Sequence, residues 1–360
     1  MKKILCCVTN DLNFDQRMIK ICSSLSKEGY DVTLTGRKLK SSGALQQQPY
    51  RQHRIYCFFT KGKLFYLEFN LRLSYFLIKN RYDVFCAVDL DTILPCLLYS
   101  GIRNKKLVYD AHEYFTEVPE VVARPIVQMI WQWVARISIP RADLCYTVSP
   151  SLSKIFEQKY QRPFRVIANV PYLKAEEQSN AGKEMFILYQ GALNRGRALE
   201  PLIEAMPDLD MELHLVGDGD LTDELKKLVN KLNIGNKVKF LGRMRPEQLM
   251  AYTSKAWLGY NLLKREGLSY YYSLSNKFFD YIHSGVPVLC SPFPEYVRIN
   301  EEFQVSCFSE PVAAKIVDSV NRLIDDPGLY HRLRENCLQA RQVYHWGHEE
   351  KKLIRYYHGL

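Results

Sequence analysis

The sequence predicts an α/β protein built from two doubly wound domains, each with a parallel sheet. Short apolar runs, of the length of a buried strand, alternate with longer segments of helical spacing, which is the pattern of a parallel sheet covered by helices. The alternation occurs twice, on either side of a polar, patternless stretch at residues 172–184. We therefore expect a first domain at residues 1–170, a second at 171–340, and one more helix at 341–360.

In the first half, the N-terminus leads directly into a strand, and Ser149 is a short polar residue suited to cap a helix. The polar segment 37–54 is expected to be a loop, with Ile55–Phe59 a candidate strand. The other expected strands are Ile4–Val8, Asp31–Thr35, Asp83–Val88, Leu107–Asp110 and Leu144–Val148, and the expected helices are Gln16–Lys27, Leu64–Lys79, Thr92–Tyr99, Glu120–Arg141 and Pro150–Lys159.

The second half repeats this order, with glycines at several strand ends. One helix is expected between Arg197 and Met206, and a short one ends at Gly285 because Pro287 prevents its continuation. The expected strands are Phe186–Tyr189, Glu212–Val216, Val238–Leu241, Trp257–Leu262, Val286–Cys290 and Val305–Phe308, and the remaining helices are Leu221–Leu232, Pro246–Lys255, Val312–Ile324 and Leu329–His345.

The composition limits the kinds of ligand and the cellular location that we expect. The net charge of +10 suits nucleic acid, an anionic membrane surface or an acidic substrate, but no nucleic-acid-binding signature is present. We favour phosphorylated ligands and an anionic membrane surface, and expect no nucleic acid partner. The ten cysteines are scattered through apolar runs and read as core residues in a reducing compartment. With neither a signal peptide nor a transmembrane stretch, the expected location is the cytoplasm, or the inner face of the membrane.

Residues 273–292 contain the most informative stretch, read as a loop, a short helix and a buried strand. Ser275 or Asn276 is expected to cap the helix. A helix N-terminus reached by a tight loop favours anions, and Lys277 places a positive charge in the first turn, where the helix dipole disfavours it. Asp280 follows one turn later. The pairing suits a phosphate-plus-hydroxyl ligand such as a nucleotide sugar; an ordinary capped helix is the alternative.

Glycines and arginines follow the other strands of the second half. In a doubly wound domain the ligand binds at the carboxyl ends of the strands, and glycine lets backbone approach it closely. Each arginine alone reads as a solvated surface charge, but together they suit a diphosphate. The absence of a third glycine after Gly217-Asp-Gly219 excludes a nicotinamide enzyme. The residues expected at this edge are Gly191, Arg195, Arg197, Gly217 and Arg243.

The first half offers two weaker candidates. His112 follows a strand, where a histidine hydrogen-bonds a sugar hydroxyl or tunes proton transfer; the alternative is a structural histidine that holds the next loop. Asp89-Leu90-Asp91 has the spacing of a metal-dependent sugar-transfer motif, but Asp91 reads equally as a helix cap, and we expect no metal or other cofactor. The basic, aromatic helix Arg124–Arg136 suits a membrane interface, although core packing is favoured.

These motifs resemble those of a known family. The strand end Gly191-x-x-x-Arg195-Gly196, the Gly-Asp-Gly strand end and Ser-Asn-Lys277-Phe-Phe-Asp280-Tyr-Ile-x-Ser-Gly285-Val-Pro-Val look like those of GT-B glycosyltransferases, most of all the retaining enzymes of family 4. The resemblance covers nearly the whole chain and is more specific in the second half. It implies two Rossmann-like domains that face each other across a cleft, with C-terminal helices packing back on the first.

The resemblance also implies roles for individual residues. A carboxylate five residues before the Gly-x-Pro glycine binds the donor ribose in this family, and Asp280 stands there. The loop before the helix supplies backbone N–H groups to the diphosphate; the matching residues are Leu274, Ser275 and Asn276.

The resemblance also implies roles for three basic residues and for one histidine. Arg195 matches a basic residue that contacts phosphate, with Arg197 assisting, and Lys277 matches a lysine found in one branch. His112 matches a histidine near the transferred sugar. The family's first carboxylate would fall at Tyr272, and Asn10–Asp15 replaces its usual glycine-rich loop.

The implied function is retaining, metal-independent transfer of a sugar from a nucleoside-diphosphate sugar to a glycan or lipid-linked acceptor, in surface polysaccharide or glycolipid synthesis. Positive charges and the helix N-terminus would stabilise the departing diphosphate. Tyr272 and the missing glycine loop leave a second hypothesis, a catalytically silent sugar-nucleotide-binding scaffold subunit. A GT-B nucleotide-sugar epimerase, which needs no acceptor, is the third.

Overall fold

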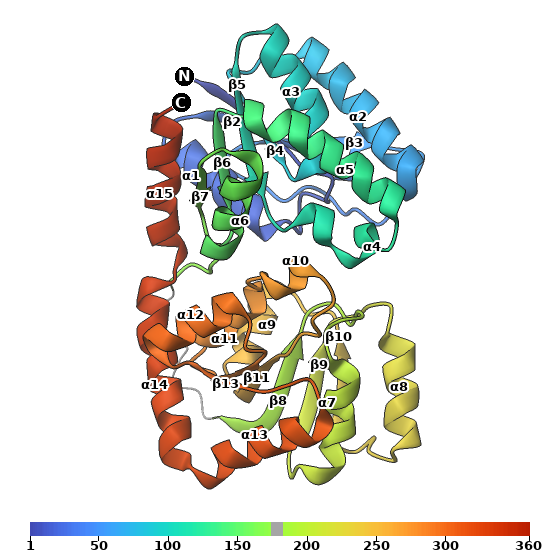
Figure 1. The fold of residues 1–360 in the computed structure, drawn as a ribbon, viewed down its shortest axis with the longest axis vertical. Coiled ribbons are helices and arrows are strands. Elements are labelled where there is room, and N and C mark those ends of the chain that lie inside the picture. Colours follow the sequence, from blue (N-terminus) through green and yellow to red (C-terminus); the bar gives the residue numbers. More distant parts are fainter. Residues whose placement is uncertain (174–182) are drawn as a thin grey trace. The chain divides into compact units, whose positions relative to one another are not determined.

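The computed structural model describes residues 1–173 and 183–360. Most of the boundary segment expected at 172–184 lies outside the described residues. The chain divides into two compact units (Figure 1). The N-terminal unit comprises residues 1–169 and 348–360, and the C-terminal unit comprises residues 170–347.

The N-terminal unit contains a parallel sheet of seven strands in the order β3-β2-β1-β4-β5-β6-β7. Because β1 lies between β2 and β4, the strand order reverses there, which creates the switch point at which doubly wound sheets bind ligands. The strands are β1 (Lys3–Cys7), β2 (Asp31–Lys38), β3 (Arg51–Tyr56), β4 (Val84–Val88), β5 (Lys106–Ala111), β6 (Leu144–Thr147) and β7 (Phe164–Val166).

Helices cover both faces of this sheet (Figure 1). The Ser149 side chain accepts a hydrogen bond from the Leu152 amide and caps α6, as the sequence predicts. The helices are α1 (Gln16–Lys27), α2 (Gly62–Lys79), α3 (Ile93–Ile102), α4 (Pro119–Val122), α5 (Pro125–Ser138) and α6 (Pro150–Tyr160), with short 3₁₀ turns η1 (Leu90–Thr92), η2 (Phe115–Glu117) and η3 (Ile139–Arg141).

Two elements of this unit differ from the expectation. The single helix expected at Glu120–Arg141 is divided into α4, α5 and η3, because Pro125 and Pro140 cannot supply the N–H bonds that a continuous helix needs. The segment expected to be a loop contains β3 and the end of β2. Strand β3 is an edge strand with only Ile55 buried, so its sequence is too polar for the buried-strand pattern.

The C-terminal unit repeats the architecture with six parallel strands in the order β10-β9-β8-β11-β12-β13. The switch point here lies between β8 and β11. The strands are β8 (Glu184–Gln190), β9 (Glu212–Val216), β10 (Val238–Gly242), β11 (Ala256–Asn261), β12 (Val288–Cys290) and β13 (Ser306–Phe308). The helices are α7 (Leu199–Ala205), α8 (Thr222–Lys231), α9 (Pro246–Thr253), α10 (Leu268–Tyr271), α11 (Asn276–His283), α12 (Pro294–Phe303), α13 (Ala313–Asp325) and α14 (Pro327–Val343), with η5 (Met206–Asp208).

The last helix, α15 (Trp346–His358), packs on the N-terminal unit. The Tyr357 hydroxyl lies 3.3 Å from that of Tyr146 in β6, and the Glu349 carboxylate accepts a hydrogen bond from the Ala168 amide at 2.8 Å. These contacts confirm the expected fold class, in which C-terminal helices return to the first domain. All ten cysteines are free and nine are buried.

Candidate functional site

The candidate site of the C-terminal unit is built where β8 and β11 end, at the switch point of the sheet. Strand β8 ends at Gln190, and Gly191 begins the following turn. Strand β11 ends at Asn261, which is 1% exposed. The Asn261 side-chain oxygen accepts a hydrogen bond from the Ser275 hydroxyl at 2.9 Å. This bond ties the start of α11 to the carboxyl end of the sheet.

Two glycines pack the neighbouring strand ends together. Gly191 and Gly217 have positive φ angles of 131° and 139°, in a region that side-chain-bearing residues rarely adopt. A Cβ atom at Gly217 would lie 1.9 Å from the Gly191 carbonyl oxygen, and one at Gly191 would lie 3.6 Å from the Lys277 ammonium. The absence of a side chain at Gly217 thus lets the turns after β8 and β9 lie in contact, and Gly191 borders Lys277.

The first turn of α11 differs from the expected cap. Ser275 holds the N-cap position, but its side chain makes no capping hydrogen bond because its hydroxyl binds Asn261. The Ser275 amide donates to the Tyr296 hydroxyl at 3.2 Å. Leu274 is 9% exposed and Asn276 is exposed. The α11 N-terminus is therefore positioned by side chains of β11 and α12, rather than capped by its own serine.

Lys277 is partly buried and forms no ion pair within the described residues. Its ammonium lies 3.9 Å from the centre of the Tyr189 ring, and within the described residues it makes no hydrogen bond or ion pair. Burial lowers the pKa of Lys277 well below its usual range, the positive charge of Arg197 lowers it further, and Asp280 opposes both. A bound anion beside Lys277 would offset this cost of burying the charge.

Asp280 lies one turn further along α11, partly buried. Its carboxylate accepts a hydrogen bond from the Gln190 side-chain amide at 2.9 Å. The Gln190 oxygen in turn accepts from the Thr253 hydroxyl at 2.7 Å, which fixes the orientation of the amide. The Tyr281 hydroxyl donates to the Leu188 carbonyl at 2.9 Å, so α11 is held against β8 at two successive residues.

The three arginines expected at this edge occupy different surroundings. Arg197 is partly buried, and its guanidinium lies 4.9 Å from the centre of the Tyr270 ring. Arg195 is exposed, and its guanidinium binds no other part of the described chain. Arg243 is also exposed and lies 3.9 Å from the Asp218 carboxylate. Of the residues expected at this edge, Arg197 and Asp280 lie close enough to Lys277 to change its pKa.

His112 follows β5 in the N-terminal unit, between two carboxylates. Its Nε2 lies 3.1 Å from Asp110, and its Nδ1 lies 4.0 Å from Asp89. Asp110 is fully buried and forms an ion pair with Arg17 at 2.8 Å. Burial lowers the pKa of His112, but Asp110 and Asp89 raise it more, to about 9. His112 is therefore an imidazolium at neutral pH, a hydrogen-bond donor and not a general base.

The Asp89-Leu90-Asp91 segment lies at the switch point of this sheet. The Thr9 hydroxyl donates to Asp91 at 2.5 Å and the His112 amide donates to Asp89 at 2.9 Å. Asp89 has a positive φ of 52°. Burial raises the pKa of Asp91 to about 6, although the Thr9 hydrogen bond lowers it. Among residues 1–173 and 183–360, no group of three or more His, Cys, Asp or Glu residues is arranged to hold a metal ion.

Family models match both halves of the chain. The model for group 1 glycosyl transferases matches residues 173–339, and the model for glycosyltransferase family 4 matches residues 16–170. The chain belongs to the group 1 glycosyltransferases. Their GT-B fold agrees with the two units described above, and the resemblance expected from the motifs at Gly191 and Lys277 is confirmed.

Individual relatives of this glycosyltransferase are distant in sequence. An α-D-kanosaminyltransferase of Streptomyces kanamyceticus is 22% identical over 67% of each chain. Sucrose-phosphate synthase from Thermosynechococcus elongatus has a TM-score of 0.79 at 18% identity, covering 100% of this chain and 99% of that one. HepE of Anabaena, solved with UDP-glucose, has a TM-score of 0.79 at 17% identity and covers 100% of both chains.

In each unit the structure adds residues to the candidate sites that sequence reasoning missed. Gln190 orients Asp280, Tyr189 supports Lys277, and Asp110 holds His112. Each stands at the end of an expected strand, where a polar or aromatic residue after an apolar run is a usable signal. Arg17 carries no such signal, because it lies in the first turn of an ordinary amphipathic helix.

Proposed function

We propose that the chain is a retaining, metal-independent glycosyltransferase that moves a sugar from a nucleoside-diphosphate sugar to a glycan or lipid-linked acceptor. The observation that carries the proposal is the Lys277 ammonium, which is partly buried beside Gly191 and forms no hydrogen bond or ion pair within the described residues. A diphosphate at the N-terminus of α11 supplies the missing negative charge.

The donor class draws support from the structural neighbours. HepE was solved with UDP and with UDP-glucose, and its fold matches this chain over the full length of both. The C-terminal switch point of this chain brings together a helix N-terminus, Lys277 and the Asp280 carboxylate. We infer a nucleoside diphosphate sugar as donor, with the diphosphate near Lys277 and Arg197.

The cations act on the leaving group. As the bond between the sugar and the diphosphate breaks, negative charge grows on the diphosphate, and fixed positive charges stabilise that transition state. Lys277 is held by its packing on Tyr189, and Arg197 by its packing on Tyr270. Arg195, whose guanidinium is exposed, completes the charge from the turn after β8. These cations supply the charge that a divalent ion supplies in metal-dependent enzymes, so we propose a reaction without one.

Asp280 and the loop before it recognise the nucleoside end. A carboxylate accepts hydrogen bonds from two adjacent ribose hydroxyls, and the Gln190 amide holds Asp280 in one orientation. Leu274, Ser275 and Asn276 line the approach to α11, where Ser275 offers its amide if the 3.2 Å bond to Tyr296 opens. Gly191 and Gly217 have no side chains, so the adjacent turns do not project into the donor site.

His112 serves as a hydrogen-bond donor toward the transferred sugar. With a pKa raised to about 9, it holds its proton at neutral pH and does not remove one from the acceptor. The acceptor proton then passes to the departing phosphate, on the same face from which the diphosphate leaves. Attack on that face retains the anomeric configuration.

The acceptor is a glycan or a lipid-linked saccharide in surface polysaccharide or glycolipid synthesis, and we place the enzyme in the cytoplasm or at the inner face of the membrane. The support is the net charge of +10, which suits an acidic substrate or an anionic membrane surface. Arg243, exposed beside Asp218, is available at the rim of the donor site.

A screen of UDP- and GDP-sugars with and without chelator tests the proposal. We expect release of nucleoside diphosphate that persists in EDTA, retention of the anomeric configuration by NMR of the product, and a rate loss of roughly 100-fold or more for Lys277→Met. Inversion at the anomeric carbon, or dependence on a divalent ion, would overturn the corresponding part of the mechanism.

One observation favours a second function, that of a silent sugar-nucleotide-binding subunit. Tyr272 stands where the family's first carboxylate is expected, with its ring 4.9 Å from that of Tyr271. A scaffold subunit would bind UDP or GDP with normal affinity and would neither transfer nor slowly hydrolyse any donor. The same screen therefore separates the two functions.

A further inference from the structure

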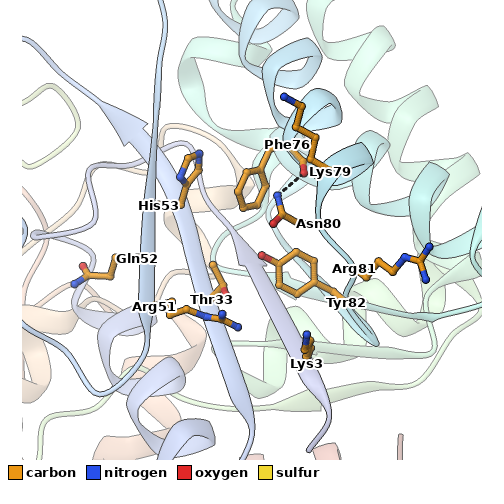
Figure 2. A pocket seen from close by; sticks show the side chains of 10 residues that line it. All are labelled: Lys3, Thr33, Arg51, Gln52, His53, Phe76, Lys79, Asn80, Arg81 and Tyr82. Carbon is orange, nitrogen blue, oxygen red and sulfur yellow. Dashed lines mark hydrogen bonds between the residues drawn. The ribbon is translucent and has the colours of Figure 1, made fainter.

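A pocket lies at the amino ends of three neighbouring strands of the N-terminal sheet (Figure 2). Lys3 begins β1, Thr33 lies near the start of β2, and Arg51 begins β3. The volume of about 310 Å³ is at the lower end of the range for ligand pockets, roughly 300 to 1,000 Å³. Doubly wound sheets normally bind ligands at the carboxyl ends of their strands, where His112 lies, so this pocket occupies the opposite edge of the sheet.

The register of the sheet places the polar side chains of the pocket on one face. Lys3 pairs with Asp31 across β1 and β2, and Thr33 pairs with Arg51 across β2 and β3. Residues two apart on a strand point to the same face of a sheet, as do register partners of parallel strands. Lys3, Thr33 and Arg51 therefore share a face, and the C-terminal end of α2 with the residues that follow it completes the pocket.

The Thr33 hydroxyl is buried without a hydrogen-bond partner among the described residues. Thr33 as a whole is 4% exposed, and it lines the pocket. Burial raises the pKa of Tyr82, and the nearby Thr33 hydroxyl lowers it, but the two hydroxyls are not aligned as donor and acceptor. Because a buried hydroxyl without a partner destabilises a fold, a ligand oxygen in the pocket would offset a cost that the chain itself leaves in place.

The lining of the pocket is positively charged. Asp31 binds Arg51 at 2.5 Å. Asp83 binds Lys105 at 2.8 Å and the Lys3 amide at 2.9 Å. Asp31 thus neutralises one cation of the pocket, and Asp83 is shared with a lysine outside it, which leaves a surplus of positive charge. The lining contains no carboxylate and four basic residues, Lys3, Arg51, Lys79 and Arg81.

An aromatic pair, which we call the aromatic wall, forms another part of the lining. The His53 ring stacks on the Phe76 ring, with 4.3 Å between ring centres and 13° between ring planes. Burial lowers the pKa of His53, so the imidazole is mostly neutral at pH 7. The Asn80 side-chain amide donates to the Phe76 carbonyl at 2.8 Å (Figure 2) and holds the end of α2. The aromatic wall offers an uncharged surface to the carbon skeleton of a ligand.

We propose that this pocket binds a small phosphomonoester, with the phosphate at Lys3, Thr33 and Arg51 and the carbon skeleton against the aromatic wall. A phosphomonoester carries nearly two negative charges at pH 7 and three acceptor oxygens, which match two cations and one hydroxyl without a partner. A carboxylate has one charge and two oxygens, and would leave more of these donors unused. The exposed basic residues at the rim add attraction at longer range.

Isothermal titration of the full chain tests the pocket with ribose 5-phosphate, glycerol 3-phosphate and inorganic phosphate as probes. We expect at least one of the esters to bind severalfold more tightly than inorganic phosphate, because only an ester reaches the aromatic wall. Unphosphorylated ribose should show no binding, because it lacks the charge. Binding of either ester supports the pocket, and the tighter of the two identifies the kind of carbon skeleton that it takes.

Two matched threonine variants locate the bound phosphate. Thr33→Val keeps the shape of the side chain and removes the hydroxyl, so the fold should be as stable as before or more stable, while affinity for the esters falls by roughly fivefold. Thr35→Val is the control. The Thr35 hydroxyl is also buried without a partner among the described residues, on the same strand and face, but Thr35 does not line the pocket. Its replacement should leave ester affinity unchanged.

Charge variants separate the pocket from the donor site. Lys3→Gln should weaken ester binding by roughly tenfold, whereas Lys2→Gln, exposed and outside the lining, should not. Lys3→Gln should also bind UDP as the wild type does, and Lys277→Met should bind the esters as the wild type does. The pocket does not depend on the proposed function, and with these variants a failure of the pocket and a failure of the donor site are observed separately.

Three results would overturn the proposal. The first is that neither ester binds to the wild type more tightly than inorganic phosphate does. The second is that Thr33→Val and Thr35→Val have the same ester affinity, because the unpartnered hydroxyl would then play no part in binding. The third is that Lys277→Met loses ester binding while Lys3→Gln keeps it, because that result would place the bound ester at the donor site of the C-terminal unit.

Discussion

The Lys277 ammonium lies 3.9 Å from the centre of the Tyr189 ring, next to the glycine at position 191. The aromatic ring provides a weak cation site, and Arg197 repels the same charge. Lysine in the first turn of a helix also opposes the helix dipole. An anion bound at this end of α11 would offset both the repulsion by Arg197 and the unfavourable interaction with the helix dipole.

Replacing Lys277 with methionine should remove the charge and keep most of the packing on Tyr189. We expect affinity for both UDP and inorganic pyrophosphate to fall by roughly tenfold or more, because both carry the diphosphate. Isothermal titration measures both affinities. Lys227→Met, at an exposed position of α8, is the control and should leave them unchanged. Wild-type affinity in Lys277→Met would remove Lys277 from the donor site.

Gln190→Leu should affect the nucleoside end alone. The substitution removes the 2.9 Å hydrogen bond that orients Asp280 and leaves Lys277 in place. UDP affinity should fall severalfold while pyrophosphate affinity is unchanged, since pyrophosphate has no ribose. A parallel loss of both affinities would mean that Gln190 acts by supporting the local fold, and not by positioning Asp280.

Gly217→Ala should destabilise the C-terminal unit. The new Cβ would lie 1.9 Å from the Gly191 carbonyl oxygen at a φ of 139°, so the backbone must shift, at a cost of about 3 kcal/mol or more. Urea denaturation measures this loss. Gly235→Ala is the matched control, because a Cβ there has no neighbour within 4 Å, and it should change stability by less than about 1 kcal/mol.

His112→Asn should alter how stability depends on pH. The folded pKa of His112 is raised from 6.5 to about 9, so its stabilising effect is fully present below pH 6.5 and is lost as the pH rises through about 9. The wild type should exceed the variant by on the order of 2 kcal/mol at pH 6, and the difference should shrink toward pH 9.

Urea denaturation across this pH range measures the difference, with exposed His331→Asn as the control. A constant difference between wild type and His112→Asn from pH 6 to pH 9 would contradict the pairing of an imidazolium with Asp110 and Asp89. A difference that grows with pH would mean that folding lowers the pKa of His112 instead of raising it.

Much of the fold could be predicted from the local pattern of apolar residues and of helix-ending proline and glycine. Buried parallel strands are continuous apolar runs, and Pro150 or Gly285 marks a helix boundary by its own backbone chemistry. The edge strand β3 was missed because only one of its residues is buried. The division of α4 from α5 was missed, although Pro125 is a clear breaker, because the apolar periodicity continues across it.

The sequence singles out residues of the candidate site, but it does not show which other residues they contact. Lys277 and Asp280 stand out at a helix start, and Gly191 at a strand end. No local pattern shows that Ser275 would bind Asn261 instead of capping its own helix, or that Asp110 would pair with both Arg17 and His112. These contacts join residues far apart in the chain, and only the topology brings them together.

The exposed apolar side of α2 was beyond sequence reasoning for a related reason. A stripe such as Leu64, Leu67 and Leu71 reads as a core-facing side until the structure shows that Phe69 and its neighbours occupy the core instead. Both sides of the helix are apolar, so periodicity alone could not assign the buried one.

The most direct measurement is the number of protons taken up when UDP binds at alkaline pH, obtained by calorimetry in two buffers of different ionisation enthalpy. Burial and Arg197 lower the pKa of Lys277 in the free protein, and a bound diphosphate should raise it again. The account predicts proton uptake by the wild type and none by Lys277→Met. Binding of UDP without proton uptake, or equal uptake by both proteins, would contradict it.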